Sequence, residues 1–250
     1  MAEIIFEHVT KSFDGHIALD DVSFEVEKGE FVFIIGKSGA GKSTLLNLIT
    51  KQLEVTGGSV SVFDTRLETM KKKEVPFYRR HLGIMSQEVG MLKHMTVYDN
   101  ILLAIRAAEK TGRRTRQNIA KVLGLVGLAG KAYAFPEELS GGEQARMLLA
   151  RAMATEPDIL IADEPTANLD PDSAWDMMLL LTEIHRQGKT LIISSHAREL
   201  VTIMRKRVIT LVAGTVVADE KNAIYNQKAV DIFEERRVLR ERNEKLLKNG

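Results

Sequence analysis

Near the N-terminus, eight consecutive residues have the types and spacing of a phosphate-binding loop. The pattern G-x-x-x-x-G-K-[ST] is met by Gly36-Lys37-Ser38-Gly39-Ala40-Gly41-Lys42-Ser43. Glycines let successive backbone N–H groups turn inward around phosphate oxygens, and a following helix presents its positive end to the same anion. We therefore expect Lys42 to reach the β- and γ-phosphates, Ser43 to ligate Mg²⁺, and Thr44 to belong to the same nucleotide-binding segment.

Two acids stand at the end of a later apolar run, Ile159-Leu160-Ile161-Ala162-Asp163-Glu164. Carboxylates at the end of a buried strand are hard to explain structurally. Beside a bound triphosphate they have clear roles: Asp163 would hold Mg²⁺ through water, and Glu164 would polarise the attacking water. The pair predicts hydrolysis as well as binding.

Two further segments are ambiguous when each is taken alone. Leu139-Ser140-Gly141-Gly142-Glu143-Gln144 opens a helical pattern, and Ser with two glycines at a helix start is either a second anion site or an ordinary cap. Leu191-Ile192-Ile193-Ser194-Ser195-His196 ends a third apolar run in a histidine, which at such a position is usually structural.

The elements that would position these residues alternate between strands and helices. Apolar runs and turn residues predict antiparallel strands at 3–13 and 20–27, buried strands at 31–35, 159–162 and 191–193, and a hairpin of 207–212 and 215–218 through Ala213-Gly214. Helices are expected at 42–52, within 90–155, and from the cap Asp170, with Pro171 at the first position, to Gly188. The fold class is α/β: a parallel core, a helical insertion and antiparallel strands at the edges.

Composition limits the classes of function. The 250 residues carry a formal net charge of +1, which gives no reason to expect direct binding of nucleic acid. The absence of cysteine excludes disulfides and thiolate chemistry. No run of about 18 apolar residues occurs, and the N-terminal segment has acids where a signal peptide has basic residues. We expect a cytoplasmic protein that reaches a membrane only through a partner.

In this order and spacing the motifs resemble the ATP-binding-cassette family over roughly residues 3–220. The resemblance implies a P-loop, RecA-like core with an antiparallel β subdomain and a helical subdomain at about 90–155. The ATP-binding domain would cover 1–222, and the charged segment 223–250 would form an extension, which its pattern at 228–248 predicts to be an amphipathic helix.

The resemblance also implies roles for residues that the motifs alone do not settle. Gln87 would be the glutamine that senses the γ-phosphate and Mg²⁺, His196 would hold the γ-phosphate, and Phe13 would stack on adenine. Ser140, Gly141, Gly142 and Glu143 would form the signature, which completes the ATP site of a second copy of the chain, and Asp170 would close the D-loop. Two copies would therefore dimerise head to tail around ATP, with Mg²⁺ as the metal.

A narrower resemblance is to the FtsE group of cassettes, which act in bacterial cell division. It rests on Val75-Pro76-Phe77-Tyr78-Arg79-Arg80-His81-Leu82-Gly83-Ile84 and on Thr96-Val97-Tyr98-Asp99-Asn100, although Lys37 stands where this group has a proline. The implied partner is an FtsX-like integral membrane protein at the inner face of the cell membrane, through which ATP turnover would regulate cell-wall hydrolysis. An ATPase of a lipoprotein-releasing or macrolide-efflux system, or a soluble non-transport cassette protein, remains an alternative.

Overall fold

The computed structural model describes residues 2–86, 90–221 and 238–239. Its contacts divide the chain into two compact units. Unit 1 comprises Met1–Met70 and Ile193–Gly250, and unit 2 comprises Lys71–Ile192. The helical insertion expected at 90–155 lies within unit 2, and nearly all of the segment 223–250 lies outside the described residues.

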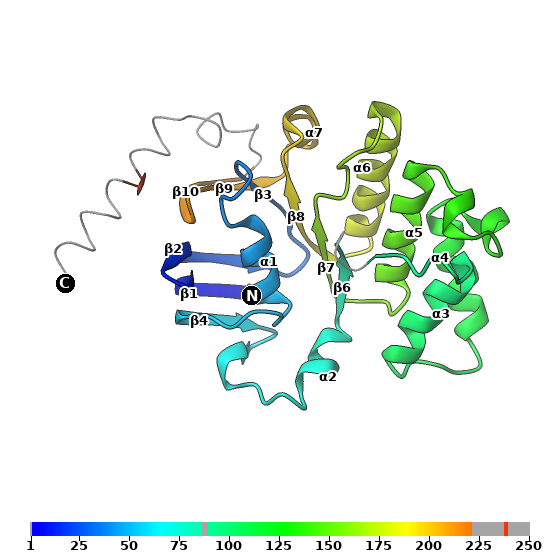
Figure 1. Cartoon of the computed structure of the whole chain (residues 1–250), viewed down its shortest axis with the longest axis horizontal. Coiled ribbons are helices and arrows are strands. Elements are labelled where there is room, and N and C mark those ends of the chain that lie inside the picture. The colour runs from blue at the N-terminus through cyan, green and yellow to red at the C-terminus, as the bar shows by residue number, and fades with distance from the viewer. Residues whose placement is uncertain (1, 87–89, 222–237, 240–250) are drawn as a thin grey trace. The chain divides into compact units, whose positions relative to one another are not determined.

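Unit 1 is built mainly from strands, which are labelled in Figure 1. They are β1 (Ala2–Phe13), β2 (His16–Glu27), β3 (Phe31–Ile35), β4 (Gly57–Val62), β5 (Thr65–Arg66), β9 (Arg207–Val212) and β10 (Thr215–Glu220). Its helices are α1 (Lys42–Ile49), the short 3₁₀ helix η1 (Leu67–Thr69) and α7 (Arg198–Met204).

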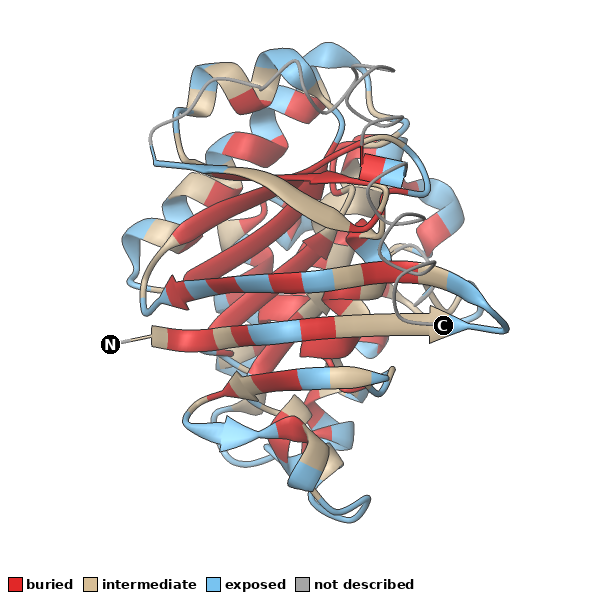
Figure 2. Ribbon diagram, turned by 90° about the vertical axis from the view of Figure 1, so that its left-hand side faces the viewer, coloured by how far each residue is buried: buried red, intermediate tan, exposed pale blue. Residues whose placement is uncertain are grey.

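The antiparallel sheet of unit 1 has the strand order β2-β1-β4-β5. The degree of burial changes from residue to residue along β1, the strand that follows the N-terminus in Figure 2. Such a change is expected for a sheet with one covered face. Phe6 and Phe24 stack across β1 and β2 with ring centroids 4.6 Å apart. The predicted strand at 20–27 begins earlier, at His16, because Asp14 (φ 42°) and Gly15 (φ 83°) turn the chain within two residues.

The second group of strands in unit 1 has the order β10-β9-β3. All five residues of β3 are buried, and β3 pairs in parallel with β9, with Ile34 opposite Ile209. Strands β9 and β10 form the predicted hairpin through Ala213 and Gly214, both of which have positive φ. This confirms the buried strand and the hairpin predicted from the sequence.

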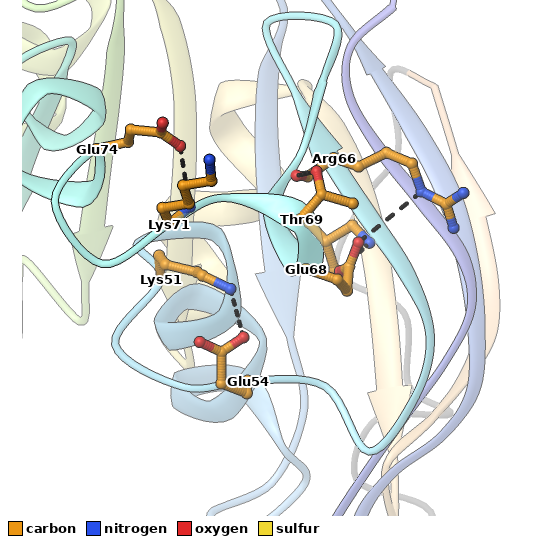
Figure 3. A network of polar contacts seen from close by, with 8 residues as sticks. Lys51, Glu54, Arg66, Glu68, Thr69, Lys71 and Glu74 are labelled. Carbon is orange, nitrogen blue, oxygen red and sulfur yellow. Dashed lines mark hydrogen bonds and ion pairs between the residues drawn. The ribbon is translucent and has the colours of Figure 1, made fainter.

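Short polar contacts shape the loops that follow α1 and β5, as Figure 3 shows. Helix α1 was expected to reach residue 52 but ends at Ile49; Lys51 then takes positive φ, and its largely buried ammonium group pairs with Glu54. Beyond β5, the Glu68 carboxylate accepts a hydrogen bond of 2.8 Å from the backbone N–H of Val60, which ties the loop to β4.

Unit 2 is mainly helical. Its helices are α2 (Val75–Arg79), α3 (Val97–Ala107), α4 (Thr115–Leu125), α5 (Gly141–Met153), α6 (Pro171–Arg186) and the 3₁₀ helices η2 (Ala129–Lys131) and η3 (Pro136–Glu138). Its strands are β6 (Leu82–Met85) and β7 (Ile159–Asp163), with β8 (Thr190–Ser195) running across the division between the units. The strand order here is β8-β7-β6, and β6 and β7 are parallel.

Helices α3, α4 and α5 pack together in unit 2 (Figure 1), around buried side chains such as Ile101, Ile105 and Met147. Helix α6 begins as predicted: Asp170 accepts a hydrogen bond of 2.9 Å from the Ser173 N–H, and Pro171 is the first helical residue. It ends just before Gly188, which has φ 83°. Within the described residues, none of the helices has both the length and the apolar character needed to span a bilayer.

Candidate nucleotide site

The phosphate loop of unit 1 connects the buried strand β3 to helix α1. The Lys42 side chain folds back into the loop, where Nζ donates hydrogen bonds to the carbonyl oxygens of Gly36 (3.0 Å) and Lys37 (3.2 Å). Lys42 is 8% exposed, whereas Ser38, Gly39 and Ser43 are exposed. The loop therefore holds a preplaced ammonium group in a cradle that is open on its outer side, as a phosphate site requires.

Two glycines of this loop are required by close backbone contacts. A Cβ on Gly36 would lie 2.4 Å from the Leu211 carbonyl oxygen in β9. A Cβ on Gly41 would lie 2.6 Å from the Ala18 carbonyl oxygen in β2, and Gly41 also has φ 101°. The sequence predicted glycines that turn N–H groups toward phosphate. The structure adds that two of these glycines allow the backbones of neighbouring strands to pack directly against the loop.

Two more predicted residues, Phe13 and His196, lie on the surface of unit 1. Phe13 ends β1 with 41% of its surface exposed, and the Lys11 ammonium group lies 4.7 Å from the centre of its ring. His196 is exposed and follows the fully buried Ser194 and Ser195 at the end of β8. Both positions are accessible to a ligand, as an adenine-stacking ring and a phosphate-binding imidazole must be.

The acids of unit 2 stand where the buried part of β7 ends. Residues Ile159–Ala162 are buried, whereas Asp163 and Glu164 are partly exposed. Glu164 has φ 52°, an unfavourable backbone conformation for a residue with a side chain, and such conformations occur preferentially at functional sites. Both acids line a cavity of about 190 Å³ whose wall includes Gly141 at the start of α5. The cavity is large enough for ordered water beside Glu164.

Helix α5 starts with a complete capping box. The Ser140 hydroxyl accepts a hydrogen bond of 3.3 Å from the Glu143 N–H, and the Glu143 carboxylate accepts one of 2.9 Å from the Ser140 N–H. Ser140 and Gly141 are exposed. Of the two interpretations that the sequence left open, the cap is therefore present, and the exposed helix start leaves room for an anion as well.

Lys131, the last residue of η2, contacts the start of α5, and the sequence did not predict this. Its Nζ lies 2.8 and 2.9 Å from the two carboxylate oxygens of Glu143. These contacts and the hydrogen bond from the Ser140 N–H lower the pKa of Glu143 from 4.5 to about 2. Glu143 is therefore ionised at neutral pH and paired. No pattern reveals this contact, because the two residues are 12 positions apart with an irregular segment between them.

The start of α5 also packs against the start of α6. Gly142 is buried, and a Cβ there would lie 2.6 Å from the Ser173 hydroxyl oxygen. Ser173 donates its N–H to Asp170, which lowers the pKa of the Asp170 carboxyl. The starts of α5 and α6 thus meet through one glycine and one serine.

Gln87 lies outside the described residues. The segment Val75–Ile84 forms α2 and part of β6; there Arg80 lies over the ring of Phe77 (4.4 Å) and pairs with Glu109 at 3.0 Å. Arg80 is therefore held within unit 2 and is not a freely solvated charge, whereas Phe77 is 58% exposed.

Three features together define an ATPase of the cassette class. They are a phosphate loop between a buried strand and a helix, two acids at the end of a parallel strand, and a helical insertion. Residues 19–167 match the family model described as ABC transporter, and the chain belongs to that family. It is an ATP-binding and ATP-hydrolysing subunit.

Two curated relatives carry the same name. The cell division ATP-binding protein FtsE of Streptococcus pneumoniae (strain D39) is 43% identical over 226 residues, which cover 90% of this chain and 98% of that protein. The protein of the same name from Bacillus subtilis is 41% identical over 212 residues, which cover 85% of this chain and 93% of that protein. Among solved structures, a dimeric ATP-binding cassette in a post-hydrolysis state, bound to ADP and Pi, superposes with a TM-score of 0.80 at 30% identity, covering 89% of this chain and all of that one.

Proposed function

We propose that this chain is the ATPase of an FtsE-type complex in cell division, and that two copies close head to tail around ATP. The observation that carries this proposal is the exposed, capped helix start at Ser140 and Gly141 in a chain that also has a complete phosphate loop. A P-loop enzyme that used its own site alone would have no need of a second anion-ready helix start. The dimeric relative and the FtsE relatives support the same function.

In this site Gly36–Thr44 binds the phosphates, with Lys42 turning from its own carbonyl partners to the β- and γ-phosphates. Phe13 stacks on adenine, and His196 holds the γ-phosphate. Glu164 polarises the attacking water. Ser140, Gly141, Gly142 and Glu143 of the second copy complete the site, and Asp170 closes the D-loop beside them.

Mg²⁺ is the metal that we propose. Ser43, Asp163 and Gln87 carry the hydroxyl, carboxylate and amide oxygens that this ion prefers, and they would hold it together with phosphate oxygens, because Mg²⁺ is usually bound by few protein ligands plus substrate phosphates. When bound, the ion neutralises charge that develops on the phosphates.

The ATP cycle would then work as a population shift. The γ-phosphate is shared by the loop of one copy and the helix start of the other, so it stabilises the closed dimer and not the open state. Hydrolysis removes the shared anion, and the dimer opens. We propose residues 1–222 as the cassette, with a helical subdomain at about 90–155 and residues 223–250 as an extension.

The partner we propose is an FtsX-like integral membrane protein, which would hold the chain at the inner face of the membrane and pass the signal to cell-wall hydrolases. Pull-down from solubilised membranes should recover such a protein. Recovery of a lipoprotein-releasing or efflux permease, or of ribosomes or DNA, would contradict the cell-division role and favour the corresponding alternative.

The dimer is tested with Glu164→Gln, which removes the carboxylate that polarises water. This variant should bind ATP with Mg²⁺, hydrolyse it at least about a hundredfold more slowly, and elute as a dimer in size-exclusion chromatography. The wild-type chain with ADP is the control and should remain monomeric. Unchanged turnover in the variant, or a monomer with ATP bound, would refute the assignment.

A further inference from the structure

Glu143 presents an electrostatic problem at the start of α5. Its carboxylate is fixed over the Ser140 N–H at 2.9 Å, in the first turn of the helix whose N-terminus is to receive a phosphate. Holding an ionised carboxylate beside a triphosphate is unfavourable, because like charges brought together repel each other. The capping box therefore places a negative charge beside the group that the site must attract.

Lys131 compensates the charge of Glu143. Its ammonium group lies within 2.9 Å of both carboxylate oxygens, so the charges of Lys131 and Glu143 cancel locally. The glutamate side chain is 19% exposed and the lysine 44%. Lys131 is the last residue of η2, and a hydrogen bond of 3.0 Å from its N–H to the Leu128 carbonyl oxygen fixes its backbone.

The Ser140 hydroxyl lies at the same helix start, where its oxygen accepts the hydrogen bond of 3.3 Å from the Glu143 N–H. An uncompensated charge on Glu143 would therefore repel a phosphate that approaches this hydroxyl.

We infer that Lys131 is a positioning residue for the signature serine: it neutralises Glu143, so that a phosphate bound by the other copy can approach Ser140 without repulsion. The inference rests on the proposed dimer. It requires that loss of Lys131 weakens ATP-driven dimerisation without weakening the binding of ATP to the phosphate loop of the same chain, and that removal of the Glu143 charge reverses the defect.

The test uses the Glu164→Gln chain as background and measures the ATP concentration that gives half-maximal dimer. Adding Lys131→Ala should raise this concentration about tenfold, since the repulsion between the Glu143 carboxylate and the phosphate is then no longer compensated and is only partly screened by salt. Lys131→Arg should stay within about threefold, because it keeps the charge. Lys121→Ala is the matched control: Lys121 forms another lysine–glutamate pair of unit 2, with Glu156 at 3.6 Å, and its loss should change nothing.

The decisive variant combines Lys131→Ala with Glu143→Gln. Glutamine can still complete the capping box but carries no charge, so the combination should return to the value of Glu143→Gln alone. Binding of a fluorescent ATP analogue to the monomer should be equal in all variants.

An unchanged dimerisation curve for Lys131→Ala, no rescue by Glu143→Gln, or a parallel loss of monomer binding would each overturn the inference. If the Glu164→Gln background itself stays monomeric with ATP and Mg²⁺, the proposed dimer fails, and the role of Lys131 fails with it. If the background dimerises and its dimerisation does not change when Lys131 is replaced, only the role of Lys131 is overturned.

Discussion

Gly214, in the turn between β9 and β10, donates its backbone N–H to the carbonyl oxygen of Ala40 in the phosphate loop at a distance of 3.0 Å. Its own carbonyl accepts a hydrogen bond of 2.9 Å from the Asp20 N–H in β2. The hairpin turn thus holds the loop in place although it lies 174 positions further along the chain. This contact gives the hairpin a part in supporting the phosphate loop that its sequence does not suggest.

The first prediction concerns Gly214→Ala. A Cβ there would lie 2.5 Å from the Ala18 carbonyl oxygen, so the turn must move away from β2 and the loop. We expect a loss of roughly 1–3 kcal/mol in the free energy of unfolding beyond backbone strain, with weaker ATP binding. Gly15→Ala is the control: Gly15 has nearly the same φ (83° against 81°) and nothing within 4 Å. Equal losses in the two variants, measured by urea unfolding, would show that the close approach is unimportant.

The second prediction compares the two neighbouring glycines at the start of α5. Gly142→Ala places a Cβ 2.6 Å from the Ser173 hydroxyl oxygen, whereas a Cβ on Gly141 meets nothing within 4 Å. We expect Gly142→Ala to lower the free energy of unfolding by about 1–3 kcal/mol and Gly141→Ala to leave it within about 0.5 kcal/mol. Thermal unfolding of both variants without nucleotide measures this difference. A Gly142→Ala variant as stable as the wild type would mean that α5 and α6 adjust freely.

The third prediction concerns Lys42→Ala. Its ammonium group is preplaced against Gly36 and Lys37, and removing it should weaken ATP binding at least thirtyfold, which corresponds to about 2 kcal/mol or more. Titration with a fluorescent nucleotide measures the dissociation constant. Lys28→Ala, at an exposed turn of unit 1, serves as the control and should bind normally. If Lys42→Ala kept its affinity for ATP, the phosphate loop could not be part of the nucleotide site.

The fourth prediction follows from the pKa of Glu143. Because its pKa is about 2 in the folded chain and 4.5 ordinarily, the stabilisation it contributes is complete above pH 4.5 and is lost as the pH falls toward 2. Lys131→Met removes the largest cause of the shift, so the pKa of Glu143 returns toward 4.5 and less stability remains to be lost. The difference in urea midpoint between wild type and variant should be larger at pH 7 than at pH 3.

An exposed lysine outside the proposed site provides the control for this titration. Lys73→Met should follow the wild type at both pH values, since Lys73 is exposed. A difference between wild type and Lys131→Met that does not change with pH would contradict the assignment of the Glu143 pKa to Lys131.

Much of the fold could be predicted because the signals are local. The apolar run of β3, the cap of α6 at Asp170 and Pro171, and the Ala213-Gly214 hairpin each depend on a few adjacent residues, and each occurs as predicted. Strands β4 and β6 were not predicted. The first contains two glycines and the second has four residues, so neither carries enough pattern to distinguish it from a loop.

The sequence by itself determined the class of chemistry, because the phosphate loop, the acids at the end of β7 and the Ser-Gly-Gly helix start are short patterns from whose residue types that chemistry could be predicted. Only the tertiary structure decided what supports these patterns: Lys131 on Glu143, Ser173 on Gly142, and Gly214 on Ala40. Such contacts join residues from separate elements, and their partners are chosen by distance in space. No periodicity or spacing along the chain records that distance.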